Sequence, residues 1–419
     1  MIVPSIDIVA GSAVQLVEGE VQAFDGGDPV AWMEHFRLAG EVAVVDIDAA
    51  RGEGDNREAV ERLCEMGRVR VGGGIRDADT ALSWLDAGAE KVVIGTAADE
   101  EILSRLPSGR VIVALDARDG EVVTHGWRAG TGRGVLESIA RFRTLCGGFL
   151  VTFVEREGRL LGTDLEMARR IVDAAGEARV TIAGGVTSTG EINALDEIGA
   201  DAQVGMALYT GRIGLAEAIT APLWSDREDG LWPTVVVDEA GLALGLAWSD
   251  ADSVAEAVET RRGVYHSRSR GRWVKGESSG AIQELLTAEV DCDRDALRFT
   301  VRQADGFCHL GTRSCWGEDG GLHRLARRLR TVAEARPAGS NTVRLLQDPG
   351  LLEAKLLEEA GELAEAVDQS DVAEELADLL YFALVKAVSA GVDLTRVEEV
   401  LDRRRRRVIR RPMAAREGT

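Results

Sequence analysis

The first half of the chain repeats itself, and this repeat limits the possible folds more than any other feature. VGGGIR from Val71 corresponds to IAGGVT from Ile182, an offset of 111 residues, and IGTA from Ile94 corresponds to VGMA from Val204, an offset of 110. Eight short apolar runs, separated by helical patterns, contain these segments. Strands that alternate with helices predict a parallel sheet, and the duplication predicts two half-barrels related by a pseudo-twofold axis. We therefore predict a (β/α)8 TIM barrel over residues 1–222.

The remainder of the chain divides at two polar stretches. APLWSDREDGLWP (221–233) ends the strand–helix alternation and leads into short strand patterns, and RPAGSNT (336–342) precedes a helix-rich segment with a break at SAG. A chain of 419 residues is too long for one ordinary core. We predict a multidomain protein in which the barrel is followed by a small α+β domain at 231–320 and an all-α helical domain at 340–412.

The bulk charge limits the partners of the chain. A formal net charge of −22 repels phosphate backbones, which argues against a general nucleic-acid role. No stretch has the length of a membrane span, MIVPSIDIV begins a strand pattern without a signal sequence, and five cysteines do not suggest a disulfide framework. We expect a cytoplasmic protein that acts on small phosphorylated molecules, without nucleic-acid or membrane partners.

Glycines follow the third, fourth, seventh and eighth strand patterns of the predicted barrel. Glycine lets backbone N–H groups approach an anion closely, and strands seven and eight of such barrels commonly build a phosphate site. Because the pattern recurs half a barrel away, it predicts a substrate phosphorylated at both ends. The alternative, that the glycines only ease strand–helix turns, explains the repeated pair poorly. The candidate phosphate-binding residues are Gly73, Gly74, Gly95, Thr96, Gly184, Gly185, Gly205 and Met206.

Asp7 and Asp116 end the first and fifth strand patterns, at an offset of 109 residues. Paired carboxylates in a shared, partly desolvated site can have separated pKa values, which supplies one base and one acid. Taken alone, either aspartate could equally well cap a helix.

Residues 1–215 resemble the histidine-biosynthesis isomerase that converts the phosphoribosylformimino aminoimidazole carboxamide ribotide from an aminoaldose to a ketose. The resemblance rests on PSIDI, VVDIDAA, VGGGIR, VIGTAA, ALDARDGEVVTHGW, IAGGVTS and VGMALYTG. It implies that Asp7 is the general base and Asp116 the general acid of an Amadori rearrangement, with Thr152 assisting and no cofactor. Gln15 replaces the family's usual arginine and Glu157 its usual aspartate, departures that bear on affinity or loop closure.

The segment VDCDRDALRF (290–299) contains three aspartates and a cysteine in five consecutive positions. In an extended strand the aspartates would share one face and the cysteine would point to the other. Three such carboxylates repel each other unless a cation lies among them, although a solvated acidic turn is the common alternative. Three thiols with a water describe an open, catalytic kind of zinc site, and aspartates suit Mg²⁺. The candidate ligands are Cys292, Cys308 and Cys315 for Zn²⁺ and Asp291, Asp293 and Asp295 for Mg²⁺.

Residues 231–317 resemble phosphoribosyl-AMP cyclohydrolase, through SRSRGRWVKGESSG, DCDRD and CHLGTRSC. The resemblance implies a zinc-binding domain that opens the purine ring of phosphoribosyl-AMP by hydrolysis. It also implies a homodimer, because the family takes its zinc ligands from two subunits. Ala281 stands where the family more often has His or Asn, so His309 is expected to carry more of the proton handling. The expected substrate-binding residues are Ser267, Arg268, Ser269, Arg270 and Lys275.

The helical segment carries an EExxE motif followed by ExxD. Spacings of three and four place carboxylates on adjacent helix faces, and two facing helices could hold Mg²⁺, although a charged solvent face is the common alternative. The motif resembles phosphoribosyl-ATP pyrophosphohydrolase and the wider all-α pyrophosphohydrolases, which include nucleotide house-cleaning enzymes. The candidate magnesium ligands are Glu358, Glu359, Glu362, Glu375 and Asp378.

The three families catalyse consecutive steps, so the sequence predicts a trifunctional histidine-biosynthesis enzyme that uses Zn²⁺ and Mg²⁺. We expect it to dimerise through its middle and helical domains. In one alternative only the barrel is active and the remainder is a metal-stabilised dimerisation module. In another, the tail is a general nucleotide pyrophosphatase. Whether the barrel also isomerises phosphoribosylanthranilate stays open.

Overall fold

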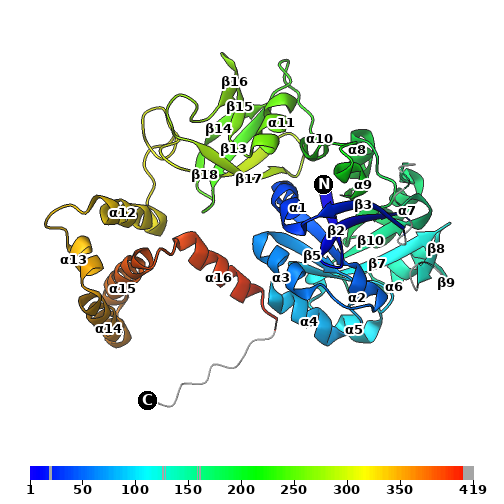
Figure 1. Cartoon of the computed structure of the whole chain (residues 1–419), viewed down its shortest axis with the longest axis horizontal. Coiled ribbons are helices and arrows are strands. Elements are labelled where there is room, and N and C mark those ends of the chain that lie inside the picture. The colour runs from blue at the N-terminus through cyan, green and yellow to red at the C-terminus, as the bar shows by residue number, and fades with distance from the viewer. Residues whose placement is uncertain (18–20, 125–126, 128, 158, 160–161, 409–419) are drawn as a thin grey trace. The chain divides into compact units, whose positions relative to one another are not determined.

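The computed structural model describes the 419 residues except 18–20, 125–126, 128, 158, 160–161 and 409–419 (Figure 1). The chain forms two compact units. The first contains Met1–Asp238 and Gly245–Asp305 together with the segment from Arg406 onward, and the second contains Glu239–Leu244 and Gly306–Arg405. The first unit thus includes the predicted barrel and most of the predicted middle domain.

Eight parallel strands close a barrel in the first unit, which confirms the predicted fold of this region. The ladder runs in the order β10-β11-β12-β1-β4-β5-β6-β7 and returns to its start through a β10–β7 pairing. The side chains of the barrel strands Ile2–Val9, Arg68–Gly72 and Arg179–Ala183 are almost continuously buried, as expected for strands covered on both faces. The eight strands are β1 (Ile2–Val9), β4 (Glu41–Asp46), β5 (Arg68–Gly72), β6 (Lys91–Ile94), β7 (Val111–Arg118), β10 (Gly148–Phe153), β11 (Arg179–Ala183) and β12 (Ala200–Val204).

Helices surround the barrel (Figure 1). In both halves, helices begin with a polar N-cap residue. Asp77 accepts a hydrogen bond from the Thr80 amide before α4, and Ser188 accepts one from the Glu191 amide before α8. Such polar N-caps satisfy amides that the helix itself leaves unpaired. The helices are α1 (Pro29–Phe36), α2 (Ile47–Arg51), α3 (Arg57–Met66), α4 (Ala78–Ala87), α5 (Glu100–Ser104), α6 (Val135–Phe142), α7 (Leu165–Ala175), α8 (Thr189–Glu197), α9 (Met206–Tyr209) and α10 (Leu215–Thr220), with short 3-10 turns at Arg37–Ala39, Ser108–Arg110 and Val154–Arg156.

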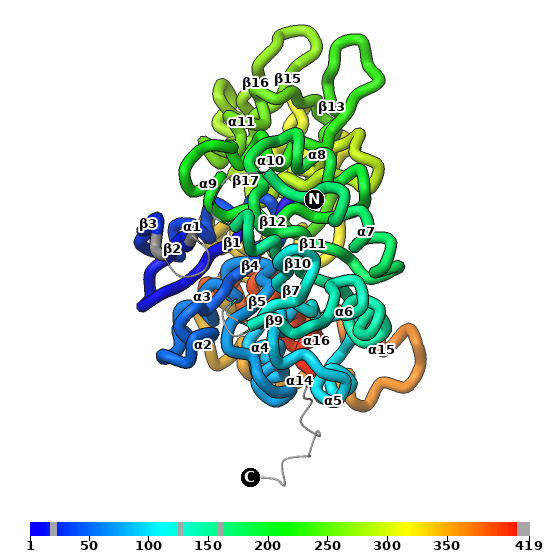
Figure 2. Tube along the Cα trace, turned by 90° about the vertical axis from the view of Figure 1, so that its right-hand side faces the viewer, coloured from blue at the N-terminus to red at the C-terminus, as the bar shows by residue number. Residues whose placement is uncertain are grey.

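Two hairpins that the strand patterns did not predict extend the barrel strands carrying Asp7 and Asp116. β2 (Ser12–Val17) and β3 (Val21–Gly27) continue from β1 and project from the barrel in dark blue (Figure 2). β8 (Glu121–Thr124) and β9 (Ala129–Gly134) continue from β7 in the other half. The pseudo-twofold repeat therefore includes the segments that border the predicted catalytic mouth.

A second sheet follows the barrel in the order β14-β13-β18-β17. Tyr265 and Phe299 are fully buried against this sheet, with ring centroids 5.7 Å apart. The elements are β13 (Trp232–Asp238), β14 (Ala243–Ser249), α11 (Ala251–Thr260), β17 (Gln283–Val290) and β18 (Leu297–Gln303), with β15 (Val264–Ser267) and β16 (Gly271–Val274) forming a separate two-stranded ladder.

The remainder of the chain is mostly helical. A small apolar core, which includes Leu329, Leu352 and Val385, holds its helices together. The predicted break at SAG is confirmed, since α15 ends at Ser389. In the described part of the chain, no helix combines the length and the apolar character needed to cross a membrane. The helices are α12 (Gly321–Ala335), α13 (Asn341–Gln347), α14 (Pro349–Glu365), α15 (Gln369–Ser389) and α16 (Leu394–Arg406).

Candidate active sites

Asp7 and Asp116 lie near the carboxyl ends of β1 and β7, where the strands of a parallel barrel present their functional side chains. Burial raises the pKa of Asp7 to about 7. Burial also raises the pKa of Asp116, while hydrogen bonds with Trp127 and Thr152 oppose the rise. Thr152 is the direct neighbour of Asp116 in the β10–β7 ladder. The structure thus brings the predicted acid and its predicted hydroxyl partner together.

Glu157 adds a third carboxyl group to this mouth. Burial and the nearby negative charges of Asp7 and Asp116 raise the pKa of Glu157 to about 8. Its side chain lines a cavity of about 30 Å³ together with the glycines that follow β11 and β12. The sequence marked Glu157 only as a departure from a family pattern, because its burial depends on contacts that no local signal encodes.

The predicted phosphate cradles have matching backbone geometry in the two half-barrels. Gly73 and Gly184 have φ angles of +96° and +90°. A Cβ atom would lie 2.1 Å from the Asp46 carbonyl oxygen at Gly73 and 2.5 Å from the Phe153 carbonyl oxygen at Gly184. Only glycine tolerates both the dihedral angle and the close approach. The alternative that the glycines only ease strand–helix turns therefore accounts for Gly73 and Gly184. It does not account for the glycines that follow them.

The next glycines border the cavity itself. Gly185, Gly205 and Met206 line it, the place where a phosphate cradle would need backbone amides. Gln15 is 3% exposed, and a Cβ atom on Gly205 would lie 2.4 Å from its Oε1 atom. A neutral amide thus supports this cradle at the position where the resembled family usually has a guanidinium.

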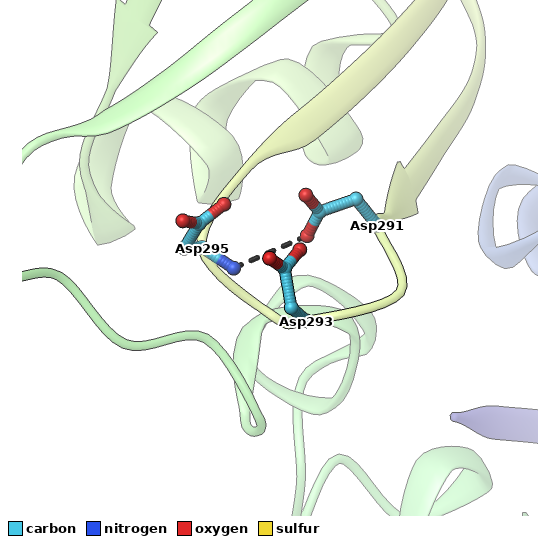
Figure 3. Close-up of side chains that lie close together, drawn as sticks. All are labelled: Asp291, Asp293 and Asp295. Atoms are coloured by element: carbon cyan, nitrogen blue, oxygen red, sulfur yellow. Dashed lines mark hydrogen bonds between the residues drawn. The ribbon is translucent and has the colours of Figure 1, made fainter.

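The three aspartates after β17 lie together, but not on a strand. Their carboxylate oxygens lie within 4.8 Å of one another on the loop between β17 and β18 (Figure 3). The premise of an extended strand was wrong, because Asp291 Oδ1 accepts hydrogen bonds from the amides of Asp295 and Ala296, each at 3.1 Å, and curls the backbone. Burial and the charges of Asp293 and Asp291 raise the pKa of Asp295. One oxygen of each carboxylate would reach a single Mg²⁺ ion after a small closure of the group, since opposite ligands at about 2.1 Å lie about 4.2 Å apart.

The three cysteines are divided between the two units. Cys292 is exposed in the first unit, and its Sγ atom lies 3.9 Å from Asp293 Oδ1. Cys308 and Cys315 belong to the second unit, where hydrogen bonds with the Leu310 backbone, Thr312 and Cys315 lower the pKa of the Cys308 thiol. His309 Nδ1 lies 3.8 Å from Cys308 Sγ. A readily ionised thiol beside a second one suits Zn²⁺, and the three-cysteine site stays a prediction.

The expected phosphate-binding segment of the second sheet forms the turn between β15 and β16. Ser267 Oγ and Ser269 Oγ lie 3.5 Å apart, and the Arg270 amide closes the turn on the Ser267 carbonyl. Arg268 lies over the Trp248 ring, 5.2 Å from its centroid. Lys275 is buried just after β16. The turn therefore gathers two hydroxyl groups and two guanidinium groups in one short segment.

A second acidic group lies between α14 and α15. Oxygens of Glu359, Glu375 and Asp378 lie within 4.8 Å of one another, an arrangement that fits one Mg²⁺ ion. Burial and the charge of Glu362 raise the pKa of Glu375, which places Glu362 beside this group. Glu358 is not in the group and accepts a hydrogen bond from Lys355 Nζ at 2.8 Å.

Three family models match the chain in succession. The histidine biosynthesis protein model matches residues 1–214, the phosphoribosyl-AMP cyclohydrolase model matches 245–317, and the phosphoribosyl-ATP pyrophosphohydrolase model matches 322–405. The order is the one that the sequence motifs predict.

Curated relatives agree with this succession. A histidine biosynthesis trifunctional protein of Neurospora crassa is 38% identical over 349 residues, which cover 80% of this chain and 36% of the relative. The trifunctional protein of Saccharomyces cerevisiae is 46% identical over 200 residues, covering 47% of this chain and 25% of the relative. An imidazole-4-carboxamide isomerase of Myxococcus xanthus is 42% identical over 226 residues, covering 50% of this chain and 94% of that protein. The chain spans less than half the length of the first curated relatives that it matches.

Proposed function

The chain belongs to the histidine biosynthesis protein family, and we propose that it catalyses three consecutive steps of histidine biosynthesis. Phosphoribosyl-ATP would lose pyrophosphate, the purine ring of phosphoribosyl-AMP would open, and the resulting aminoaldose would isomerise to the ketose. The observation that carries this proposal is the succession of three matched families in one chain, in which the product of each reaction is the substrate of the next. The chemistry would run from the C-terminal part of the chain to the barrel.

In the barrel, Asp116 acts as the acid and Asp7 as the base. Asp116 donates a proton to the ribose ring oxygen as the ring opens, and Asp7 takes the C2 proton to give the enolamine, which becomes the ketone. A pKa of about 7 suits Asp7 for this task, since a general base works best near the ambient pH. Thr152 orients Asp116 through the hydrogen bond between their side chains. No cofactor takes part.

In the middle segment, Cys292, Cys308 and Cys315 would hold Zn²⁺ and the aspartate loop would hold Mg²⁺. Zn²⁺ bound there supplies the Lewis acidity that activates water toward the purine ring. His309, beside Cys308, moves the proton that the water loses. Ser267, Arg268, Ser269, Arg270 and Lys275 bind the substrate's phosphoribosyl groups.

In the helical segment, the group of Glu359, Glu375 and Asp378 would hold Mg²⁺. The ion bound there neutralises the triphosphate of phosphoribosyl-ATP. Lys355 Nζ pairs with Glu358 at 2.8 Å and with Glu359 at 3.2 Å.

The proposal is tested by incubating the purified full chain with phosphoribosyl-ATP, Mg²⁺ and Zn²⁺ and resolving the products by mass spectrometry and chromatography. The ketose and pyrophosphate are expected. Asp116→Asn should stop at the aminoaldose, Cys308→Ser at phosphoribosyl-AMP, and Glu375→Gln at phosphoribosyl-ATP. Isomerisation alone would instead favour a barrel joined to a dimerisation module. Equal hydrolysis of ordinary nucleoside triphosphates would favour a general pyrophosphatase.

We also propose a cytoplasmic homodimer in which two copies share each zinc site, as the resemblance to phosphoribosyl-AMP cyclohydrolase implies. Mixing Cys292→Ser chains with Cys308→Ser chains should then restore part of the ring-opening activity, since one mixed site recovers all three thiols. Mixed chains as inactive as either parent would count against shared sites.

A further inference from the structure

The aspartate loop is held from outside by the barrel. Arg294, in the middle of the loop, donates from Nε to Asp196 Oδ2 at 2.8 Å and from Nη2 to Asp196 Oδ1 at 2.9 Å. Asp196 lies in α8 on the barrel, and its side chain is only 10% exposed. A two-point pair between a guanidinium and a carboxylate fixes orientation as well as distance. The loop is therefore oriented by a residue 98 positions earlier in the chain.

The segment that leaves the barrel makes a second attachment. Trp224 donates from its ring Nε1 to the Asp293 carbonyl oxygen at 2.9 Å. The Trp224 backbone amide donates to the Arg294 carbonyl oxygen, also at 2.9 Å. Two consecutive carbonyl groups of the loop thus bind one linker residue, which limits the rotation of the peptide that joins them.

The loop needs such restraints because of its own chemistry. Arg294 has a φ angle of +66°, a left-handed conformation that costs a non-glycine residue free energy. Its Nη1 atom also donates to the Asp291 carbonyl oxygen, so one guanidinium joins the first residue of the loop to the barrel. Asp291, Asp293 and Asp295 repel one another at their short separation, which favours an open loop whenever no cation is bound.

We propose that Asp196 and Trp224 are positioning residues for a magnesium site at Asp291, Asp293 and Asp295, holding the loop in its ion-binding form before the ion arrives. This inference rests on the proposed magnesium role of the three aspartates. It makes the isomerase barrel a structural part of the site that opens the purine ring. Neither residue is a proposed ligand of the ion. Asp196 acts through the Arg294 side chain, and Trp224 acts through the carbonyl groups of Asp293 and Arg294.

The test is a titration of the full chain with Mn²⁺, in which free Mn²⁺ is followed by electron paramagnetic resonance. All proteins carry Glu375→Gln and Asp378→Asn, which remove the helical acidic group, and Asp293→Asn identifies the signal of the loop. Asp196→Asn and Trp224→Phe are each expected to weaken Mn²⁺ binding by about tenfold, the usual effect of losing a residue that orients metal ligands. Asp196→Glu, which retains the charge, should recover part of the affinity.

Glu34→Gln is the matched control. Glu34 on α1 accepts from Arg261 at 2.9 Å, so this variant removes another ion pair between the barrel and the following domain without touching the loop. Mn²⁺ binding should then be unchanged. The melting temperature in chelator and the isomerase rate should match the parent in every variant, which separates a positioning effect from a loss of folding.

The possible outcomes distinguish the positioning role of Asp196 and Trp224 from the proposed magnesium role of the three aspartates. If Asp293→Asn abolishes the binding seen in the parent protein while Asp196→Asn and Trp224→Phe keep normal affinity, the positioning role is overturned and the magnesium site stays in place. If Asp293→Asn does not alter the binding seen in the parent protein, the magnesium role of the aspartates is overturned and the inference with it. Weakened binding in both variants, with Glu34→Gln unaffected, supports both.

Discussion

At the scale of single residues, the mouth of the barrel is a coupled set of carboxyl groups. Asp7 has a pKa of about 7 and Glu157 one of about 8, so near neutral pH the base is partly ionised while Glu157 stays mostly protonated. A protonated Glu157 can donate a hydrogen bond into the cavity that the glycines of the proposed phosphate cradle line. Its neutral form suits an anionic substrate, whereas its ionised form would repel one.

The pH dependence of isomerisation follows from these pKa values. As the pH rises through about 7, Asp7 loses its proton and becomes a base, so kcat/KM should rise. Above about 8, Glu157 ionises and its charge should raise KM by about three- to tenfold. In Glu157→Gln, KM should no longer rise above about pH 8, because no carboxylate forms at this position. The rise of kcat/KM near pH 7 should remain, because Asp7 is unchanged. Steady-state kinetics between pH 6 and 9 measure both (about 1–2 units either side of these pKa values). Glu166→Gln, on the exposed face of α7, is the control, and a KM that still rises in Glu157→Gln contradicts the assignment.

The helical acidic group gives a second prediction for single residues. Glu359 belongs to the group and is 5% exposed, whereas Glu358 pairs with Lys355 at an exposed position. Glu359→Gln should lower the rate of pyrophosphate release by about 100-fold or more, and Glu358→Gln by only a few-fold, since a ligand is lost in one case alone. The measurement is pyrophosphate release at saturating Mg²⁺. An equal loss in both variants would show that Glu358 binds the ion as the motif predicts.

At the scale of elements, the cradle glycines are required by the packing of one strand end against its neighbour. Gly73→Ala and Gly184→Ala combine a positive φ angle with a clash against a backbone oxygen, and each should lower the free energy of unfolding by about 2–4 kcal/mol. Gly11→Ala has a φ angle of +80° with nothing within 4 Å of the added carbon, and should cost about 1 kcal/mol. Denaturant unfolding measures all three. An equal loss in the free energy of unfolding in all three variants would mean that the positive φ angle alone requires glycine at these positions.

The sequence predicts the elements whose signal is local. The eight barrel strands were predictable because strands covered on both faces are continuous apolar runs. The β8–β9 hairpin was missed because AGTGRG in β9 is exposed throughout and carries no alternation. The aspartate loop was expected as a strand, since the amide hydrogen bonds of Asp291 that curl it have no sequence pattern of their own.

Site residues, like the elements, are predictable from the sequence where their signal is local or repeated. Asp7 and Asp116 were found because the internal repeat relates them, and the three grouped aspartates were found because they are adjacent in the chain. The raised pKa of Glu157 and the pairing of Arg294 with Asp196 depend on residues far apart in sequence, so only the folded chain reveals them.

At the scale of the whole molecule, the proposed activities differ in their need for metal ions. Prolonged treatment with a strong chelator should abolish pyrophosphate release and ring opening, because the carboxylate and thiol groups lose the ions proposed for them. Isomerisation should remain within about twofold of its original rate, since the roles proposed for Asp7 and Asp116 are proton transfer, the role proposed for Thr152 is to orient Asp116, and none of the three is a proposed metal ligand. Assays with each of the three substrates, before and after restoring Mg²⁺ and Zn²⁺, make the measurement. Loss of isomerisation together with the other two reactions would contradict a metal-free barrel.

In the proposed isomerisation, the duplicated barrel also has to distinguish the two ends of its substrate. A molecule phosphorylated at both ends would fit two matching cradles in either direction, and only one direction would bring C2 to Asp7. The two aspartates differ in their neighbours at the equivalent positions of the strand ladder. Asp116 neighbours Thr152 in β10, whereas Asp7 neighbours Val45 in β4. One carboxyl group therefore has a hydroxyl beside it and the other an aliphatic side chain. In the proposed isomerisation, this difference between Val45 and Thr152 is one feature by which a near-symmetric scaffold treats its two ends unequally.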